Sequence, residues 1–532
     1  MLQTYAKYLN LVSDSLAAKP SISQVLLGIG SDDGREPPKV AVDLLRALAH
    51  LFKHSSLKAK MAKAFSSDED NVPAQIRTLF SRILEQILLI GDSAQSLKPV
   101  SQASGDVLGA LFGTLTLIDF LDTIEVLLQR PSDDLRRKVL QLLENRLRQN
   151  PERDGASQVR MLDFLSTLVH IIQSSPDALL KHAAVSCVDR ITDKYGRKDP
   201  SKVIDAAKVV ASEACIGQED HRIRIMGVLC LASMAEVLGE AMIPALPATL
   251  NRSLGLLELS LEEGKENSRL HDAVFSLFSA LFVHLPFMIS ASHLDKVLLL
   301  SFKSTTSDVD ESSEESRQEA LRLMARKVDV AATFSAVDRN WQQAVAAGPE
   351  ATKETLEAVS LAIEKHPKSS TMKNLPVLST FLFKAFDLRR EQVAKGTKTD
   401  FELSDIDEIE DTMNDLTIKM IYKLNDTTFR PVFTKFLEWA TGGLPKKDTQ
   451  GNVSRLTTFY KFLEVFFRSL QSIVTGYASY IIENVVAVLA SARPSDQHSK
   501  PLWLATMRML RHAFEHDQDG THNFTFIINI EP

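Results

Sequence analysis

Length, composition and charge exclude several classes of protein before any motif is considered. The chain has 532 residues, of which 44% are hydrophobic and 24% are charged, the usual balance of a protein that can bury a core. Its formal net charge of −7 argues against a protein that wraps nucleic acid through a uniformly basic surface. With 21 glycines and 20 prolines, the composition favours long helices over strands joined by tight turns.

Apolar residues recur at helical spacing along nearly the whole chain, and the alternating pattern typical of strands is scarce. The helices that this spacing predicts, in chain order, are 38–55, 73–90, 105–129, 133–148, 157–173, 177–195, 201–214, 220–238, 267–284, 350–365, 372–390, 403–424, 428–440, 453–490 and 500–515. The pattern therefore predicts an all-α protein.

The start and stop signals of these helices repeat at a regular distance. Asp134, Asp177 and Asp220 each stand at a predicted helix start and follow one another at intervals of 43 residues, and the glycines that end the second and third of these helices show the same interval. A further copy, GKENSRLHDAVF, begins at Gly264. A period of about 40–47 residues with two helices per repeat is typical of HEAT and armadillo repeats. We therefore predict a HEAT/armadillo-like α-solenoid of stacked helical pairs, with a single globular helical bundle as the alternative.

Three segments interrupt the helical pattern. Residues 304–319 carry a net charge of −5 and residues 400–411 a net charge of −7, and both are interpreted as acidic loops. Residues 441–454 are rich in turn-forming residues. The predicted organisation is HEAT-like repeats over 1–300, an acidic serine-rich loop over 301–319, a helical region over 320–516 and an atypical tail over 517–532.

Serines of the first acidic segment are candidate modification sites. Ser307, Ser312 and Ser313 have the acidic neighbours that acid-directed kinases prefer. A solvated acidic loop without modification is the simpler interpretation.

No pattern predicts catalysis, a cofactor or a metal. His512, Glu515 and His516 have the H-x-x-E-H spacing of some zinc hydrolases, but no third ligand stands out nearby, so we interpret them as solvated residues of a helix. The three cysteines are interpreted as reduced core thiols and not as a disulfide or zinc site. They are Cys187, Cys215 and Cys230. The chain is predicted not to be an enzyme.

One stretch is long enough to cross a membrane. Residues 273–294 contain no Lys, Arg, Asp or Glu, but they carry histidines, serines and a central proline. Two buried helices broken at Leu285–Pro286 explain this stretch better, so no membrane partner is predicted.

The C-terminal half carries four motifs that occur together in one family. They are Asn340-Trp341, FLFKAFDLRRE at 381–391, TFRPVFTKFLEWA at 428–440 and RLTTFYKFLEVF at 455–466. In this order they resemble the U3 small nucleolar RNA-associated protein 10 family, the giant HEAT-repeat component of the small-subunit processome. The specific resemblance covers about 330–516, whereas residues 1–300 match only the general HEAT pattern.

The resemblance implies a non-enzymatic scaffold without cofactors or small-molecule substrates. It implies a nuclear, nucleolar location and partners among the other processome proteins of the transcription-linked subcomplex, on the pre-ribosomal RNA particle with U3 small nucleolar RNA. Its implied roles are cleavage of pre-ribosomal RNA toward 18S rRNA and support of RNA polymerase I transcription.

Residues of the motifs are interpreted as structural. The aromatic residues of the 428–440 string keep helical spacing, which favours the core over a partner-binding face. Arg430 before Pro431 is interpreted as the start of a helix. The motif residues singled out are Thr428, Phe429, Arg430, Pro431, Phe433, Trp439, Asp387 and Arg389.

Two other functions stay open from the sequence. A nuclear transport receptor of the importin type is also a HEAT solenoid, but importins carry ordered acidic residues along a concave surface, whereas the acidic residues here cluster in two predicted loops. A zinc hydrolase is the third hypothesis. The apolar tail 521–532 lacks helical periodicity, and we expect its deletion to leave the melting temperature within about a degree.

Overall fold

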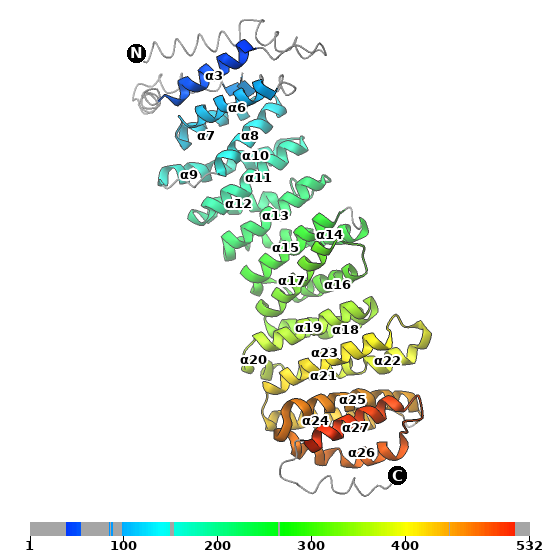
Figure 1. Cartoon of the computed structure of the whole chain (residues 1–532). Helices are drawn as coiled ribbons and strands as arrows, with labels where there is room; N and C mark the ends of the chain where they lie inside the picture. The colour runs from blue at the N-terminus through cyan, green and yellow to red at the C-terminus, as the bar shows by residue number, and fades with distance from the viewer. Residues whose placement is uncertain are drawn as a thin grey trace. The chain divides into compact units, whose positions relative to one another are not determined.

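The computed structural model describes residues 39–54, 84–85, 87–88, 98–148, 154–263, 267–445 and 447–515. Every regular element among these residues is a helix (Figure 1). The chain divides into two compact units, unit 1 over Met1–Arg252 and unit 2 over Ser253–Pro532. The predicted helix 73–90 is described at only four positions, and the tail 517–532 lies outside the described residues.

Unit 1 consists of helical pairs. Its elements are α3 (Lys39–Lys53), α6 (Lys98–Phe112), α7 (Leu117–Leu128), α8 (Asp133–Leu147), α9 (Gly155–Asp163), α10 (Leu165–Ser174), α11 (Ala178–Tyr195), η1 (Gly196–Lys198), α12 (Pro200–Val210), α13 (His221–Leu238) and η2 (Gly239–Met242). Helices α8, α11 and α13 lie side by side in one row, and α7, α9, α10 and α12 form the second row. Helix α14 (Leu246–Glu263) crosses the boundary between the units.

The 43-residue spacing corresponds to the stacked row of unit 1. Asp177 and Asp220 cap α11 and α13, their carboxylates accepting hydrogen bonds from the backbone N–H of Leu180 at 2.8 Å and of Arg222 at 2.9 Å. Asp134 lies in the first turn of α8, where an acidic side chain suits the helix dipole. The same row ends at the predicted glycines, Gly196 and Gly239. The repeat prediction is therefore confirmed.

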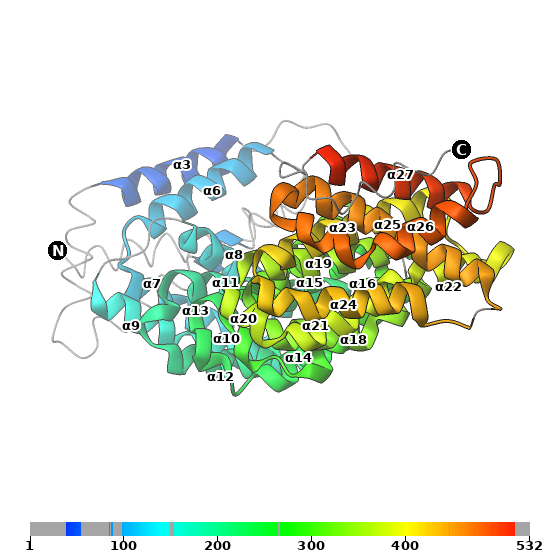
Figure 2. The same ribbon diagram turned by 90° about the horizontal axis from the view of Figure 1, so that it is seen from below.

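Unit 2 continues the same construction. Its elements are α15 (Ser268–His284), η4 (Pro286–Met288), α16 (Ala291–Thr305), α17 (Glu311–Lys327), α18 (Val330–Ala347), α19 (Pro349–Lys365), α20 (Lys368–Lys373), α21 (Leu375–Phe386), α22 (Leu388–Lys395), η5 (Gly396–Lys398), α23 (Leu403–Tyr422), α24 (Asp426–Gly442), α25 (Thr449–Leu470), η6 (Gln471–Tyr480), α26 (Ile482–Ser491) and α27 (Lys500–Glu515). Successive contacts join α15, α17, α19, α23, α25 and α27 into row A, and α16, α18, α21 and α24 into row B. Figure 2 shows α25 and α27 on one side of this unit and α21 and α24 on the other.

Ion pairs connect neighbouring helices within each row. They run from one repeat to the next, so each repeat is held by charge as well as by apolar packing. The pairs are Arg317–Glu354, Lys353–Glu408 and Lys461–Asp407 in row A, and Arg339–Asp295 and Lys384–Asp338 in row B.

The prediction of two acidic loops is wrong. Only residues 306–310 of the first segment are irregular, because α17 begins at Glu311, and α23 takes up the second segment from Leu403. On α23, Ile406, Ile409 and Met413 form an apolar stripe that packs into the core. Acidic residues in the first turns suit both helix N-termini, and neighbouring helices supply cations to Asp407, Glu408 and Glu410 of α23. Charge counts alone misread two amphipathic helices as loops.

Ser313 illustrates the consequence for the serine candidates. Its side chain is fully buried, and its hydroxyl donates a hydrogen bond to the Ser268 carbonyl at 3.0 Å. A kinase cannot reach this side chain in the folded protein. Ser312 remains exposed and Ser307 half-exposed.

Other boundaries also differ from the prediction. The loop predicted over 441–454 shortens to the residues between Gly442 and Thr449. The long helix predicted over 453–490 divides at Gln471, whose φ of 52° ends α25. The break at Leu285–Pro286 is confirmed, since α15 ends one residue before it.

One segment, His221–Met242, is long and apolar enough to cross a membrane among the described residues. It comprises α13 and η2, and it packs against α11 and α12. Its buried side chains therefore belong to the core of unit 1.

The three cysteines are buried and free, and all lie in unit 1. Burial raises the pKa of each thiol, that of Cys215 to about 12. Because the thiolate is the reactive species, we expect Cys187, Cys215 and Cys230 to react with an aromatic disulfide reagent only when unit 1 opens. Absorbance should show slow release of the reagent's aromatic thiol in buffer, and rapid release of three equivalents of it per chain in urea. Rapid labelling in buffer would contradict this burial.

Candidate functional site

The four sequence motifs meet in unit 2, and the first contact joins Trp341 to Phe381. Trp341 on α18 is 1% exposed, and its ring meets that of Phe381 on α21 edge-on, with 5.3 Å between the ring centroids. Next to it, the Asn340 amide donates a hydrogen bond to Asp295 on α16 at 2.7 Å. The Asn-Trp motif thus anchors three successive helices of row B.

A second contact surrounds Phe386, at the end of α21. Its ring lies 4.5 Å from Phe436 and 6.2 Å from Trp439 on α24, and 6.0 Å from Phe462 on α25, measured between centroids. Phe429, Phe433 and Phe436 are buried, and Trp439 is half-buried. The helical spacing of these aromatic residues therefore places them toward the core.

Asp387 and Arg455 join two motifs that are 68 residues apart. Arg455 on α25 donates bidentate hydrogen bonds to the Asp387 carboxylate at 2.6 and 2.8 Å, and Arg390 approaches the same carboxylate at 2.8 Å. Arg455 also donates to the Trp439 carbonyl at 3.2 Å, and its guanidinium lies 5.0 Å from the centre of the Trp439 ring. One arginine therefore connects α22, α24 and α25.

Arg389 forms the second buried ion pair of the cluster. It donates to Glu410 on α23 at 2.7 and 2.6 Å, and Glu410 also accepts from Thr458 at 2.6 Å and from Lys461 at 2.9 Å. Arg389 and Lys461 both bind Asp407, which is exposed. We call Asp387, Arg389, Glu410, Arg455 and Lys461 the charge cluster. Its charges satisfy one another, so it joins helices and does not resemble a reaction centre.

The cluster lowers the pKa of its buried carboxyls. Burial alone would raise the pKa of Glu410, but hydrogen bonds and charge from Arg389, with Lys461 and Thr458, outweigh it and lower that pKa. Burial alone would also raise the pKa of Asp387. Hydrogen bonds and charge from Arg455 and Arg390 outweigh this effect, so the pKa of Asp387 is lowered as well.

These lowered pKa values predict acid sensitivity of unit 2. A carboxyl whose pKa is lower in the folded state than in the unfolded state stabilises the fold at a pH above its unfolded pKa, which is about 4. This stabilisation is lost as the pH falls through the pKa of the folded state. We expect the urea midpoint of unit 2 to be steady from about pH 8 to about pH 5 and to decline below about pH 4. Tryptophan fluorescence can follow it, because all three tryptophans lie in unit 2. The urea midpoint should decline less steeply with falling pH in Asp387→Asn. An identical slope would contradict the assignment of part of this acid sensitivity to Asp387.

Thr428, Arg430 and Pro431 lie outside the buried part of the cluster. The helix begins at Asp426, because the Asn425 side chain accepts a hydrogen bond from the Thr428 backbone at 2.9 Å and caps it. Arg430 is exposed and pairs with Asp426 at 2.5 Å, and Pro431 is exposed inside the helix. The prediction that Arg430–Pro431 starts the helix is therefore wrong, because the asparagine cap acts earlier in the chain.

Sequence reasoning missed Glu410 and Lys461. Glu410 lay in a segment interpreted as a loop, yet it follows Ile409 and precedes Met413 on the apolar face of α23. A carboxylate on an apolar helix face indicates a buried partner. That signal could have identified it.

The H-x-x-E-H motif is described only in part. His512 approaches Glu515 at 3.1 Å on α27, while His516 lies outside the described residues. Among the residues with described positions, no group of three or more His, Cys, Asp or Glu side chains could hold a metal ion.

Comparison with known proteins extends the resemblance to nearly the whole chain. The BP28CT (NUC211) domain family matches residues 370–522. The U3 small nucleolar RNA-associated protein 10 of Aspergillus oryzae is 77% identical over 518 residues, and that of Coccidioides immitis is 56% identical over 518 residues. Each match covers 97% of this chain and 29% of the relative. The chain thus spans less than a third of the relatives' length, and the similarity includes the region for which only a general HEAT pattern was predicted.

Solved structures of helical-repeat proteins are also similar. A crystal structure of importin beta matches with 12% identity and a TM-score of 0.36, covering 98% of this chain and 74% of that chain. A structure of Kap121p bound to Nup53p matches with 12% identity and a TM-score of 0.35, covering 96% of this chain and 54% of that chain. The identity of the chain follows from the sequence matches: it is a homologue of the U3 small nucleolar RNA-associated protein 10 family, corresponds to the C-terminal portion of those proteins and contains the BP28CT domain.

Proposed function

We propose that the chain is part of a non-enzymatic scaffold of the small-subunit processome, which acts in nucleolar pre-ribosomal RNA processing toward 18S rRNA. The observation that carries the proposal is the 77% identity over 97% of this chain to a protein named for its association with U3 small nucleolar RNA. Stacked helical pairs suit this role, because they present an extended surface to several partners without needing a pocket. The proposed partners are other processome proteins of the transcription-linked subcomplex and the particle containing U3 RNA.

Affinity purification from nuclear extract tests this function. A tagged chain should sediment with pre-ribosomal particles, and sequencing of its RNA should return U3 RNA and precursors of 18S rRNA. Sedimentation as a free protein, with binding to the GTPase Ran only in its GTP form, would instead support the importin-type receptor.

The proposal also includes support of RNA polymerase I transcription. Pulse labelling of nascent ribosomal RNA after depletion of the protein separates this role from processing. Reduced total label supports it, whereas normal label with accumulated precursors limits the function to processing.

A further inference from the structure

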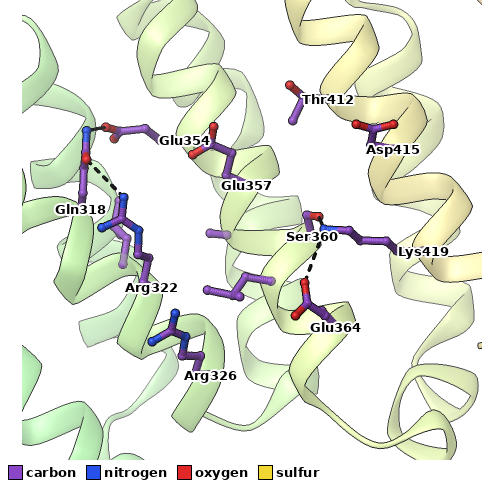
Figure 3. Close-up of a pocket in the computed structure, with 13 residues that line it drawn as sticks. Gln318, Arg322, Arg326, Glu354, Glu357, Ser360, Glu364, Thr412, Asp415 and Lys419 are labelled. Atoms are coloured by element: carbon purple, nitrogen blue, oxygen red, sulfur yellow. Dashed lines mark hydrogen bonds and ion pairs between the residues drawn. The ribbon is translucent and has the colours of Figure 1, made fainter.

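A groove crosses row A of unit 2, outside the charge cluster and its motifs. It lies over α17, α19 and α23, and its volume is about 410 Å³, within the range of protein ligand sites. Buried Leu321 and Ala358, with half-buried Leu361, give it apolar lining. Figure 3 shows its charged side chains entering from all three helices.

The groove carries opposite charges on opposite walls. Arg322 and Arg326 line it from α17, whereas Glu357 lines it from α19 and Asp415 from α23 (Figure 3). The Lys419 ammonium group donates a hydrogen bond to the Ser360 hydroxyl at 3.0 Å and forms an ion pair with the Glu364 carboxylate at 3.5 Å. The charge pattern is therefore divided into a basic wall and an acidic wall.

Several of these charges form no hydrogen bond or ion pair with the residues that the structure describes. Within the described residues, Arg326 and Asp415 are exposed and make no hydrogen bond and no ion pair within 4.0 Å, although each lines the groove. Glu357 is exposed as well and makes no ion pair within 4.0 Å, although its charge helps to raise the pKa of Lys353 on the same helix. Elsewhere in row A, Lys353 on α19 forms an ion pair with Glu408 on α23. Unpaired charges of both signs beside an apolar surface are suited to a ligand that also carries both signs.

The charges also discriminate between ligand classes. Three basic residues and four acidic residues line the groove, which leaves it slightly acidic and unsuited to a polyanion. All three walls are helices whose backbone groups are already bonded, so a strand cannot be added to them and recognition must use side chains.

We propose that this groove docks a short segment of a partner protein that carries an acidic side chain beside a basic one. The acidic side chain binds Arg322 and Arg326, the basic side chain binds Glu357 and Asp415, and an apolar side chain covers Leu361. This inference concerns unit 2 alone, and it holds whichever assembly the whole protein joins.

Site-specific photo-crosslinking identifies the occupant in the full chain. p-Benzoylphenylalanine replaces Leu361 in the groove, and in a control it replaces Phe287, an aromatic residue that is 85% exposed elsewhere in unit 2. We expect a protein adduct at position 361 whose peptide contains adjacent acidic and basic residues. A nuclease-sensitive adduct, or a yield no higher than at position 287, would overturn the proposal.

A synthetic peptide of the crosslinked segment then tests the charges. Fluorescence polarisation should show affinity lowered by at least about tenfold in Glu357→Lys/Asp415→Lys and in Arg326→Glu, because like charges then meet. Reversing the matching charge in the peptide should restore binding. Glu315→Lys, an exposed acid on α17 outside the groove, is the matched control and should bind as the unaltered chain does.

The substitutions of Arg326, Glu357, Asp415 and Glu315 are all at exposed positions, so unchanged tryptophan fluorescence and urea midpoint should accompany them. Equal affinity of the groove variants and the control, or no rescue by the reversed peptide, would contradict the docking site.

Discussion

Phe436→Ala is expected to destabilise unit 2 by about 3–5 kcal/mol, the usual cost of removing a buried aromatic ring. Phe436 is 5% exposed, and its ring centroid lies within 6 Å of five other aromatic rings. Those rings come from α21, α24 and α25, so the cavity would open where three helices meet. Urea unfolding followed by tryptophan fluorescence measures the loss.

Phe287→Ala is the matched control for this prediction. Phe287 is 85% exposed in η4, so its removal should change stability by no more than about 0.5 kcal/mol. A similarly small effect at Phe436 would contradict the core interpretation of the 428–440 motif and favour a partner-binding face.

Arg389→Met is expected to cost about 3 kcal/mol, because it leaves the Glu410 carboxylate buried without its bidentate partner. The Glu410 side chain is 1% exposed and that of Arg389 is 9% exposed, so water cannot replace the lost hydrogen bonds. Lys461 remains 2.9 Å from Glu410 and compensates part of the charge. Urea unfolding followed by tryptophan fluorescence measures this loss of stability as well.

A double variant separates charge from packing. Arg389→Met/Glu410→Met should be more stable than Arg389→Met alone, because apolar side chains then replace the whole buried pair. Arg511→Met removes an exposed arginine that pairs with Glu515, and it should leave the urea midpoint unchanged. If Arg389→Met and Arg511→Met behave alike, the charge cluster does not hold these helices together.

Local signals in the sequence were sufficient to predict the fold class and its period. A helix start depends on a side chain a few residues from the backbone groups that it caps, so Asp177 and Asp220 could be identified without knowing any neighbour. The break at Pro286 is equally local, since proline removes a backbone donor. The family resemblance likewise depended on short strings, and the sequence matches support it.

The tertiary structure decided what depends on distant partners. Whether residues 400–411 form a loop or a helix depended on Arg389, Lys461 and Lys353, which come from other helices and bind the acidic residues of α23. The sequence places Asp387 and Arg455 far apart, and only the stacking of repeats brings their side chains to 2.6 Å. Helix caps and proline breaks depend on neighbours along the chain, whereas the compensation of charge depends on neighbours in space. The repeats could therefore be predicted from the sequence, while the charge cluster and the groove arise from the packing of the helices.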